Sequence, residues 1–416
     1  MLESVPPVAD PHLAEEIQEL HTWLDSPVAA AQLAQFVALE PWLRQQQLEL
    51  TRIPAPTGLE GRRAEWLLRQ FQALGLHETE IDAVGNVIGL RPGTHPDEPL
   101  LAVTAHLDTV FPPRTVLQPT LTNGLFHGPG IADNGAGLTA MLGLLRALDD
   151  NGCRTRRGVL FVGNVGEEGE GNLRGMRHLF GESPWRGRIG RTIVVDGSGT
   201  EHITAQALGS KRLKLSFRGP GGHSWSNAGS ASAVHALARV AAALLAQIVP
   251  VAGRSAINLG AIEGGSSINT IAAEANLKLD LRATEDLELA EMVKSVRRIC
   301  AAGVAEENAL ARSGRVEARI EVIGDRPAGE LAPDSRLFRA LAAVDAALGI
   351  HSHIQRSSTD ANIPLSLGRE AVALGGGGRS GGMHTLQEWF DPCGRELGLK
   401  RLFLLLQLLT QPDPGS

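Results

Sequence analysis

The sequence predicts an α/β protein with a mixed sheet covered by helices on both faces, into which a smaller ferredoxin-like α+β domain is inserted. The chain has 416 residues, more than a single hydrophobic core usually serves, so we expect two domains. Strands rich in Val, Ile and Leu alternate with helices in two outer stretches, which is typical of a sheet buried on both faces. Between these stretches the order changes to β-α-β-β-α-β, the split βαβ pattern of a ferredoxin-like domain.

The outer stretches contain the elements of the main domain. Residues 12–48 have helical periodicity with polar faces, so we expect amphipathic helices there. After about residue 80 strands and helices alternate. We expect strands at 98–110, 158–166, 191–199 and 370–378, and helices at 135–150, 172–180 and 334–349, followed by a closing helix.

The inserted domain is predicted from strands in which polar and apolar residues alternate and from two strongly patterned helices. We expect strands at 211–219, 257–265, 274–283 and 319–325, and helices at 232–249 and 287–303. The boundaries lie near residues 209 and 325. The predicted organisation is therefore an N-terminal helical segment (1–48), a main domain (49–208 with 325–416) and an inserted domain (209–324).

Composition excludes several classes of protein. The net charge of -7 argues against nucleic-acid binding, and 43% apolar with 20% charged residues is ordinary for a soluble globular protein. The three cysteines, Cys153, Cys300 and Cys393, have no CxxC spacing, which suits a reducing cytoplasm. The N-terminus lacks the apolar run of a signal peptide, so we expect a cytoplasmic protein with no membrane or nucleic-acid partner.

Acidic and histidine residues follow several of the predicted strands. His106 and Asp108 lie two apart at a strand end and so share a face, as a metal-binding histidine and its orienting carboxylate would. Asp133 lies in a glycine-dense turn before a helix, where it could bind a ligand or cap the helix. Taken alone, each has an ordinary alternative as a surface or capping residue.

Three further groups complete the pattern. Glu167 and Glu168 follow the strand GVLFVGNVG without a neighbouring lysine or arginine, and are either solvated loop residues or partners of a strong positive charge. Asp196 ends another strand, and His384 follows a glycine-rich loop. Together the five groups lie at strand ends or in such loops of the outer stretches, where ligand sites form in α/β sheets. We therefore favour a shared site.

The charges indicate metal ions. Asp133, Glu168 and Asp196 carry three negative charges, and a bridging hydroxide would add a fourth, which two divalent cations would balance. Imidazole and carboxylate ligands without thiolates suit Zn²⁺, with Co²⁺ and Mn²⁺ as alternatives. Two such ions can activate a shared water and polarise a carbonyl.

The motifs occur in the order found in a known family. AHLDTV, GPGIADNGAG, GEEGEGNLRG, VVDG, GPGGHSWSNAG, GGSSINTIAAEANLKLDLRA and GGMHTLQEW resemble the M20 metallopeptidases over nearly all of the chain after about residue 45. STDANIPLSL and AVALGGGG are most similar to the peptidase T and glutamate carboxypeptidase side of that family. The resemblance implies a catalytic main domain and an inserted lid and dimerisation domain.

The resemblance also implies roles for single residues. His106 and Asp196 would bind one metal, with Asp108 orienting His106, and Glu168 and His384 would bind the second. Asp133 would bridge both metals, and a cis peptide bond would follow it. Glu167 would be the general base. In the lid, His223 would polarise the scissile carbonyl, in cis or from a partner subunit, and Asn269 and Arg282 would hold substrate termini. Arg282 could instead pair with Asp280 or Asp286.

The implied activity is hydrolysis of an amide bond in short peptides from one end. A metal-activated water would attack the carbonyl, with Glu167 acting as base and then as acid. Two alternatives stay open. One is the same site acting on an N-acyl amino acid or a succinyl-diamino acid. The other is a metal-binding relative without catalysis, which the presence of Glu167 disfavours.

Overall fold

The computed structural model describes residues 3–4 and 11–412, which form two compact units. Unit 1 is Met1–Ala207 with Glu330–Ser416, and unit 2 is Leu208–Gly329. The predicted inserted domain ended at residue 324, whereas unit 2 extends to Gly329 because its last strand, β15 (Glu317–Arg326), stays paired with β10 (Gly209–Arg218).

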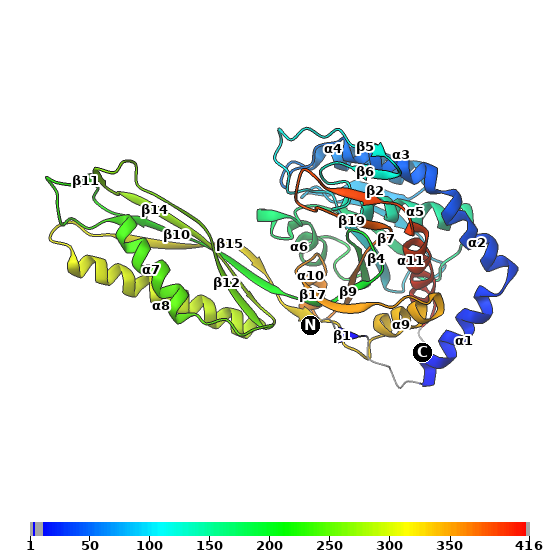
Figure 1. Ribbon diagram of the computed structural model, residues 1–416. Coiled ribbons are helices and arrows are strands. Elements are labelled where there is room, and N and C mark those ends of the chain that lie inside the picture. Colours follow the sequence, from blue (N-terminus) through cyan, green and yellow to red (C-terminus); the bar gives the residue numbers. More distant parts are fainter. Residues whose placement is uncertain (1–2, 5–10, 413–416) are drawn as a thin grey trace. The chain divides into compact units, whose positions relative to one another are not determined.

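Unit 1 is built on a ten-stranded mixed sheet with the order β1-β17-β9-β18-β8-β4-β7-β3-β2, in which β16 also pairs with β9 (Figure 1). The four central strands, β18, β8, β4 and β7, are parallel to one another, and antiparallel pairs flank them. The strands are β1 (Glu3–Ser4), β2 (His77–Ile81), β3 (Val87–Arg91), β4 (Leu100–His106), β7 (Val159–Asn164), β8 (Ile189–Val195), β9 (His202–Ala207), β16 (Gly329–Glu330), β17 (His353–Ser357) and β18 (Glu370–Leu374).

Helices cover both faces of this sheet, as predicted. On β4, Leu101 and Val103 join a core that contains side chains of α5 and α11, whereas Leu100 and Ala102 join a second core with side chains of α6 and α10. Because successive strand residues point to opposite faces and both faces are covered, β4 is buried along its whole length. The helices of unit 1 are α1 (Pro11–Leu24), α2 (Pro27–Ala38), α3 (Glu40–Thr51), α4 (Gly61–Ala73), α5 (Gly135–Asp150), α6 (Arg174–Gly181), α9 (Arg336–Leu348), α10 (Asn362–Ser366) and α11 (Arg395–Thr410).

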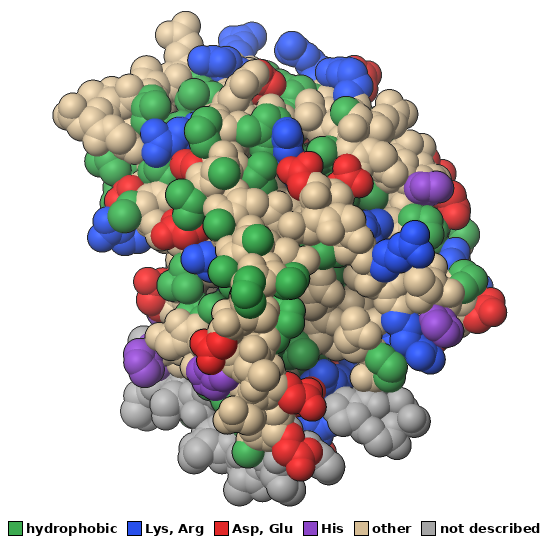
Figure 2. Space-filling view, turned by 90° about the vertical axis from the view of Figure 1, so that its right-hand side faces the viewer, with side chains coloured by type: hydrophobic (Ala, Val, Ile, Leu, Met, Phe, Trp, Pro, Cys, Tyr) green, Lys and Arg blue, Asp and Glu red, His purple; other side chains and the backbone are tan. Residues whose placement is uncertain are grey.

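The predicted N-terminal helices are α1, α2 and α3, and they belong to the body of unit 1. Phe36 of α2 and Leu43 and Leu50 of α3 are fully buried in the larger core. Figure 2 shows one face of the molecule, on which acidic and basic side chains lie mixed with exposed hydrophobic ones. Among the described residues, no helix combines the length and the apolar character needed to cross a bilayer.

A small four-stranded sheet, which the sequence did not predict, joins two distant parts of unit 1. Its order is β19-β20-β6-β5, with β5 (Thr120–Thr122), β6 (Leu125–His127), β19 (Arg379–Gly381) and β20 (Trp389–Asp391). Pairing of Trp389 with His127 and Phe390 with Phe126 brings the glycine-rich loop that carries His384 beside the loop that carries Asp133.

Unit 2 has the predicted β-α-β-β-α-β order, with an antiparallel sheet of order β12-β14-β10-β15. Its elements are β10, α7 (Ala233–Gln247), β12 (Ser255–Gly264), β14 (Glu274–Ala283), α8 (Asp286–Leu310) and β15 (Figure 1). Buried side chains of α7 and α8 form one core with the alternate residues of β10 and β14. A short ribbon of β11 (Gly222–His223) and β13 (Thr270–Ile271) lies outside this sheet.

Candidate metal centre

The candidate site is formed where parallel strands of unit 1 end. His106 is the last residue of β4, Asp196 directly follows β8, and Glu167 and Glu168 follow β7 after two intervening residues. Because β4 is parallel to both β7 and β8, these carboxyl ends meet at one edge of the sheet. Four of the predicted site residues therefore reach one place because of strand direction.

Asp133 reaches the same place from the loop before α5. The helix cap is the neighbouring Asn134, whose side chain accepts hydrogen bonds from the N–H groups of Gly137 and Gly197, each at 3.0 Å, and donates to the Val195 carbonyl at 2.9 Å. The Asp133 side chain is thus left for other contacts. The peptide bond between Asp133 and Asn134 is cis, which confirms that prediction.

The two oxygens of Asp133 face different histidines. Oδ1 lies 3.1 Å from His106 Nε2, and Oδ2 lies 3.0 Å from His384 Nε2. His106 Nε2 is also 3.6 Å from Asp196 Oδ1, and His384 Nε2 is 3.1 Å from Glu168 Oε1. Two three-residue groups result, one of His106, Asp133 and Asp196 and one of Asp133, Glu168 and His384, with Asp133 common to both.

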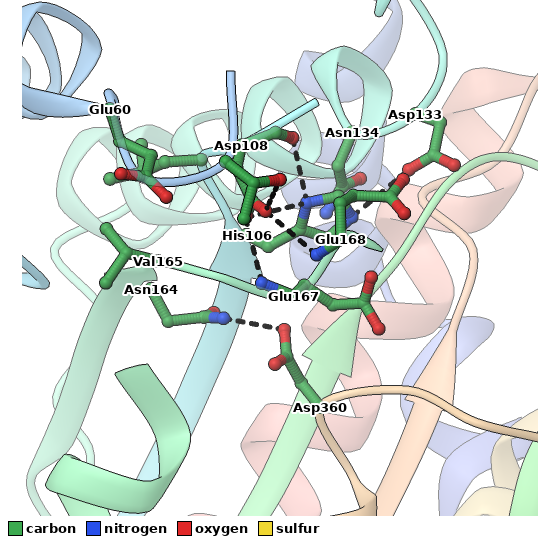
Figure 3. A network of polar contacts seen from close by, with 12 residues as sticks. Glu60, His106, Asp108, Asp133, Asn134, Asn164, Val165, Glu167, Glu168 and Asp360 are labelled. Atoms are coloured by element: carbon green, nitrogen blue, oxygen red, sulfur yellow. Dashed lines mark hydrogen bonds and ion pairs between the residues drawn. The ribbon is translucent and has the colours of Figure 1, made fainter. Parts of the chain in front are cut away.

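Asp108 makes different contacts from those expected. Its carboxylate is 3.7 Å from His106 Nδ1, and the closer partner of that nitrogen is the Asp108 backbone carbonyl at 3.1 Å. The carboxylate instead accepts hydrogen bonds from the backbone N–H of Glu167 at 3.0 Å and the N–H of Glu168 at 2.8 Å (Figure 3). It also accepts a hydrogen bond from Thr57 Oγ1 at 2.9 Å. Asp108 therefore fixes the turn that carries the two glutamates.

Crowding of buried carboxylates perturbs the protonation of the site. Burial, and after it the charges of Asp133 and Glu167, raises the pKa of Glu168 to about 8. Hydrogen bonding to Asp133 raises the pKa of His384 to about 9. The site thus favours bound positive charge, and protons on Glu168 and His384 supply part of it in the metal-free protein.

Two buried residues of the site were not found from the sequence. Asp360 is fully buried, accepts a 2.6 Å hydrogen bond from Asn164 Nδ2, and lies below the Glu167 side chain in Figure 3. Burial and the charge of Glu167 raise its pKa well above the usual value. Asp360 belongs to the STDAN segment, which the sequence analysis singled out. Its proximity to Asn164 and Glu167 could not be predicted, because both residues are far from it in the chain.

The other residue missed is Arg63, on α4. It is fully buried and donates hydrogen bonds to the carbonyls of Leu107 and Ile53, each at 2.8 Å. Burial lowers its pKa to about 10, opposed by the charges of Asp108 and Glu388, so the guanidinium remains charged at neutral pH. Arg63 is therefore a buried cation whose charge acts on Asp108 and Glu388. The sequence did not indicate it, because no lysine or arginine is adjacent to Glu167 and Glu168.

The three remaining predicted residues lie in unit 2. His223 of β11 is paired with Thr270, and the carbonyl of the adjacent Asn269 accepts a 2.9 Å hydrogen bond from the N–H of Ser224, so His223 and Asn269 share one ribbon. Arg282 lies on β14, where its Nε donates to Asp280 Oδ2 at 2.7 Å. This pairing is the alternative to substrate binding that the sequence left open.

The residues of unit 1 fit divalent metal ions. Their donors are two imidazoles and three carboxylates, the set that zinc and similar ions accept. Asp133 Oδ1 is buried and lies 3.1 Å from His106 Nε2 without the geometry of a good hydrogen bond, so its lone pairs are available to a metal. Glu167 also lies close enough to His106 and Glu168 to form a third such group.

Comparison with known proteins finds one family. A model of peptidase family M20/M25/M40 matches residues 102–408. A peptidase M20 domain-containing protein of Schizosaccharomyces pombe is 29% identical over 228 residues, 53% of this chain and 52% of that protein. An N-carbamoyl-L-amino-acid amidohydrolase of Paenarthrobacter aurescens is 35% identical over 105 residues, 25% of this chain and 21% of that protein. The chain therefore spans about half, or less, of the length of these curated relatives.

A solved structure has the same fold. A tripeptidase of Staphylococcus aureus has a TM-score of 0.73 at 23% identity, over 89% of this chain and 98% of that one. This likeness confirms the predicted fold class.

The Asp108 contacts lead to a first prediction. In Asp108→Asn one oxygen becomes an NH₂ group that cannot accept a hydrogen bond from the Glu167–Glu168 turn. The free energy of unfolding of the metal-free protein should fall by about 1–3 kcal/mol in urea titrations. Metal affinity should fall about 10–100-fold, because the turn carries Glu168.

The matched control is Thr57→Val, which removes only one of the three hydrogen bonds to Asp108. It should cost about 0.5–1.5 kcal/mol and leave the turn in place. Equal metal affinities for the two variants would show that Asp108 does not position the turn.

Proposed function

We propose, because the chain belongs to peptidase family M20/M25/M40, that it is a metal-dependent hydrolase which cleaves an amide bond in short peptides from one end. The observation that carries the proposal is the Asp133 carboxylate, whose two oxygens face His106 and His384 separately. A carboxylate with an imidazole at each oxygen is suited to bridging two metal ions.

The two groups that share Asp133 would hold the metals. His106 and Asp196 would complete the first site, and Glu168 and His384 the second. Zinc is the first candidate for these nitrogen and oxygen ligands, with cobalt and manganese as alternatives. When bound, such ions lower the pKa of a water molecule and polarise the carbonyl of the substrate.

Glu167 is the proposed general base. It is largely buried, its backbone N–H is held by Asp108, and it lies within reach of His106 and Glu168 without belonging to the pair of groups around Asp133. A carboxylate there can take a proton from the attacking water at one oxygen. It can then return this proton to the leaving nitrogen, so one group serves as base and acid.

His223 is the proposed donor to the developing oxyanion. The backbone N–H groups of Trp225 and Ser226 point at its Nδ1, at 3.2 and 3.4 Å, so Nδ1 is the acceptor and the ring proton is on Nε2. An Nε2–H donor is what stabilisation of an oxyanion requires. We propose that His223 acts either in cis or from the partner of a homodimer formed through unit 2, and that the protein works in the cytoplasm.

Two substrate classes compete. Similarity in fold to a tripeptidase along nearly the whole chain supports a short peptide. The 35% identity over 105 residues to an N-carbamoyl-L-amino-acid amidohydrolase supports an N-carbamoyl amino acid as the substrate. This class is chemically close to the N-acyl amino acids. Asn269 would hold a substrate terminus in either case. Arg282 would do so only after release from Asp280.

Replacement of the base tests the mechanism. Glu167→Gln should lower kcat by at least about 10²–10⁴-fold while bound metal, counted by elemental analysis, stays at the wild-type level. Glu170→Gln, in the same loop but exposed, is the control and should retain activity within about twofold. Hydrolysis by Glu167→Gln at the wild-type rate would remove Glu167 from the mechanism.

A substrate panel tests the choice of class. The metal-loaded protein is assayed on dipeptides and tripeptides with free and blocked N-termini, and on N-carbamoyl, N-acetyl and N-succinyl amino acids. We expect the highest kcat/KM for a free short peptide. Preference for the carbamoyl compounds would contradict the peptide assignment and show that the same site belongs to an amidohydrolase. A protein that binds metal but cleaves none would be the non-catalytic relative.

A further inference from the structure

The loop of residues 130–133, which ends in Asp133, is held on one side by a single carboxylate. Glu388 is fully buried, and its Oε2 accepts a 2.7 Å hydrogen bond from the N–H of Gly130. Its Oε1 accepts from the N–H groups of Ala132 and Asp133 at 2.8 and 2.9 Å. Because Glu388 follows His384 by four residues, the loops that carry two of the proposed ligands are tied together.

Helix α3 also holds this loop, through a backbone carbonyl. Gln47 is fully buried, and its Nε2 donates a 2.7 Å hydrogen bond to the carbonyl of Ile131, two residues before Asp133. Glu388 thus binds three N–H groups of the loop, and Gln47 binds one of its carbonyls. Removal of the donor would leave a buried carbonyl without a partner, which the loop can avoid only by shifting.

Gln47 is itself fixed from a third segment. Its Oε1 accepts a 2.6 Å hydrogen bond from Arg395 Nη2, and Arg395 is buried at the start of α11 with its guanidinium 4.7 Å from the centre of the Phe390 ring. Arg395 Nε also lies 3.5 Å from Glu40, at the start of α3. Because Phe390 is two residues from Glu388, Arg395 connects Gln47 to the segment that carries Glu388.

The space around the loop allows little movement. A Cβ atom at Gly135 would lie 2.7 Å from the Gly130 carbonyl oxygen and 3.3 Å from Thr51 Oγ1, at the end of α3. The backbone at Gly135 therefore packs closely against Gly130 and against the end of α3. A metal site tolerates ligand displacements of only about 0.5 Å, so the loop must be fixed to this precision.

We propose that α3 is part of the metal centre, with Gln47 as a positioning residue that, together with Glu388, aims the two oxygens of Asp133. The proposal rests on the proposed role of Asp133 as a shared ligand. It assigns a function to a helix that lies outside the region matched by the family model, which begins at residue 102. Both metals depend on α3, because Asp133 belongs to both groups.

The test compares two neighbouring glutamines of α3. Gln47→Met keeps the volume and removes both hydrogen bonds. Gln46→Met is the matched control, because Gln46 is also buried and its Oε1 has no hydrogen-bond partner among the described residues. The full chain is stripped of metal, and Co²⁺ and Zn²⁺ dissociation constants are measured by competition with a chromophoric chelator, beside urea unfolding of the metal-free protein.

We expect Gln47→Met to weaken metal binding about 10–100-fold, and Gln46→Met to change it less than about threefold. Equal affinities of Gln47→Met and wild type would overturn the proposal, as would equal weakening by both variants. Wild-type protein that binds neither metal would overturn the proposed metal centre itself, which is a different result.

A second variant, Gln47→Glu, keeps the proposal testable if Gln47→Met does not fold. Gln47→Glu keeps a partner for Arg395 but places a carboxylate oxygen against the Ile131 carbonyl. We expect it to fold and to bind metal at least about tenfold more weakly. Wild-type affinity in this variant would likewise overturn the role of Gln47.

Discussion

Repulsion among buried carboxylates, gathered where the parallel strands β4, β7 and β8 end, is the constraint on which the rest of the structure depends. Strand direction places Glu168 and Asp196 within a few ångströms of Asp133. Glu168 is buried and Asp133 and Asp196 are half-buried, so water screens these charges only in part. Positive charge at the centre relieves the repulsion, and the imidazoles, one facing each oxygen of Asp133, fit the divalent metal ions that we propose.

Two carboxylates that do not face this centre, Asp108 and Glu388, are bound by hydrogen bonds from the protein backbone. Asp108 accepts two backbone N–H groups of the Glu167–Glu168 turn, and Glu388 accepts three from the loop before Asp133. Arg63 adds a buried cation near both. These contacts satisfy buried charges and also position Glu168 and Asp133, the proposed ligands. The same hydrogen bonds therefore contribute to stability and to the proposed function.

The fold class could be predicted from the sequence because hydrophobic periodicity encodes which faces of strands and helices are buried. The grouping of His106, Glu168 and Asp196 was predictable for a similar reason, since each lies at or just after the end of an apolar strand. The partners of Gln47, Glu388 and Asp360 were not, because each contact joins residues far apart in the chain and leaves no local pattern. The small sheet of β5, β6, β19 and β20 escaped prediction because its strands have three residues each.

Metal stoichiometry of the wild type and of Asp133→Ala is the most direct test of the central claim, that one carboxylate serves two metal ions. Both proteins are stripped with chelator, reloaded with Zn²⁺, dialysed and analysed for metal per chain. The account predicts two equivalents in the wild type, and in the variant loss of tight binding at both positions, although His106, Asp196, Glu168 and His384 remain. Two tightly bound equivalents in Asp133→Ala, or none in the wild type, would contradict it.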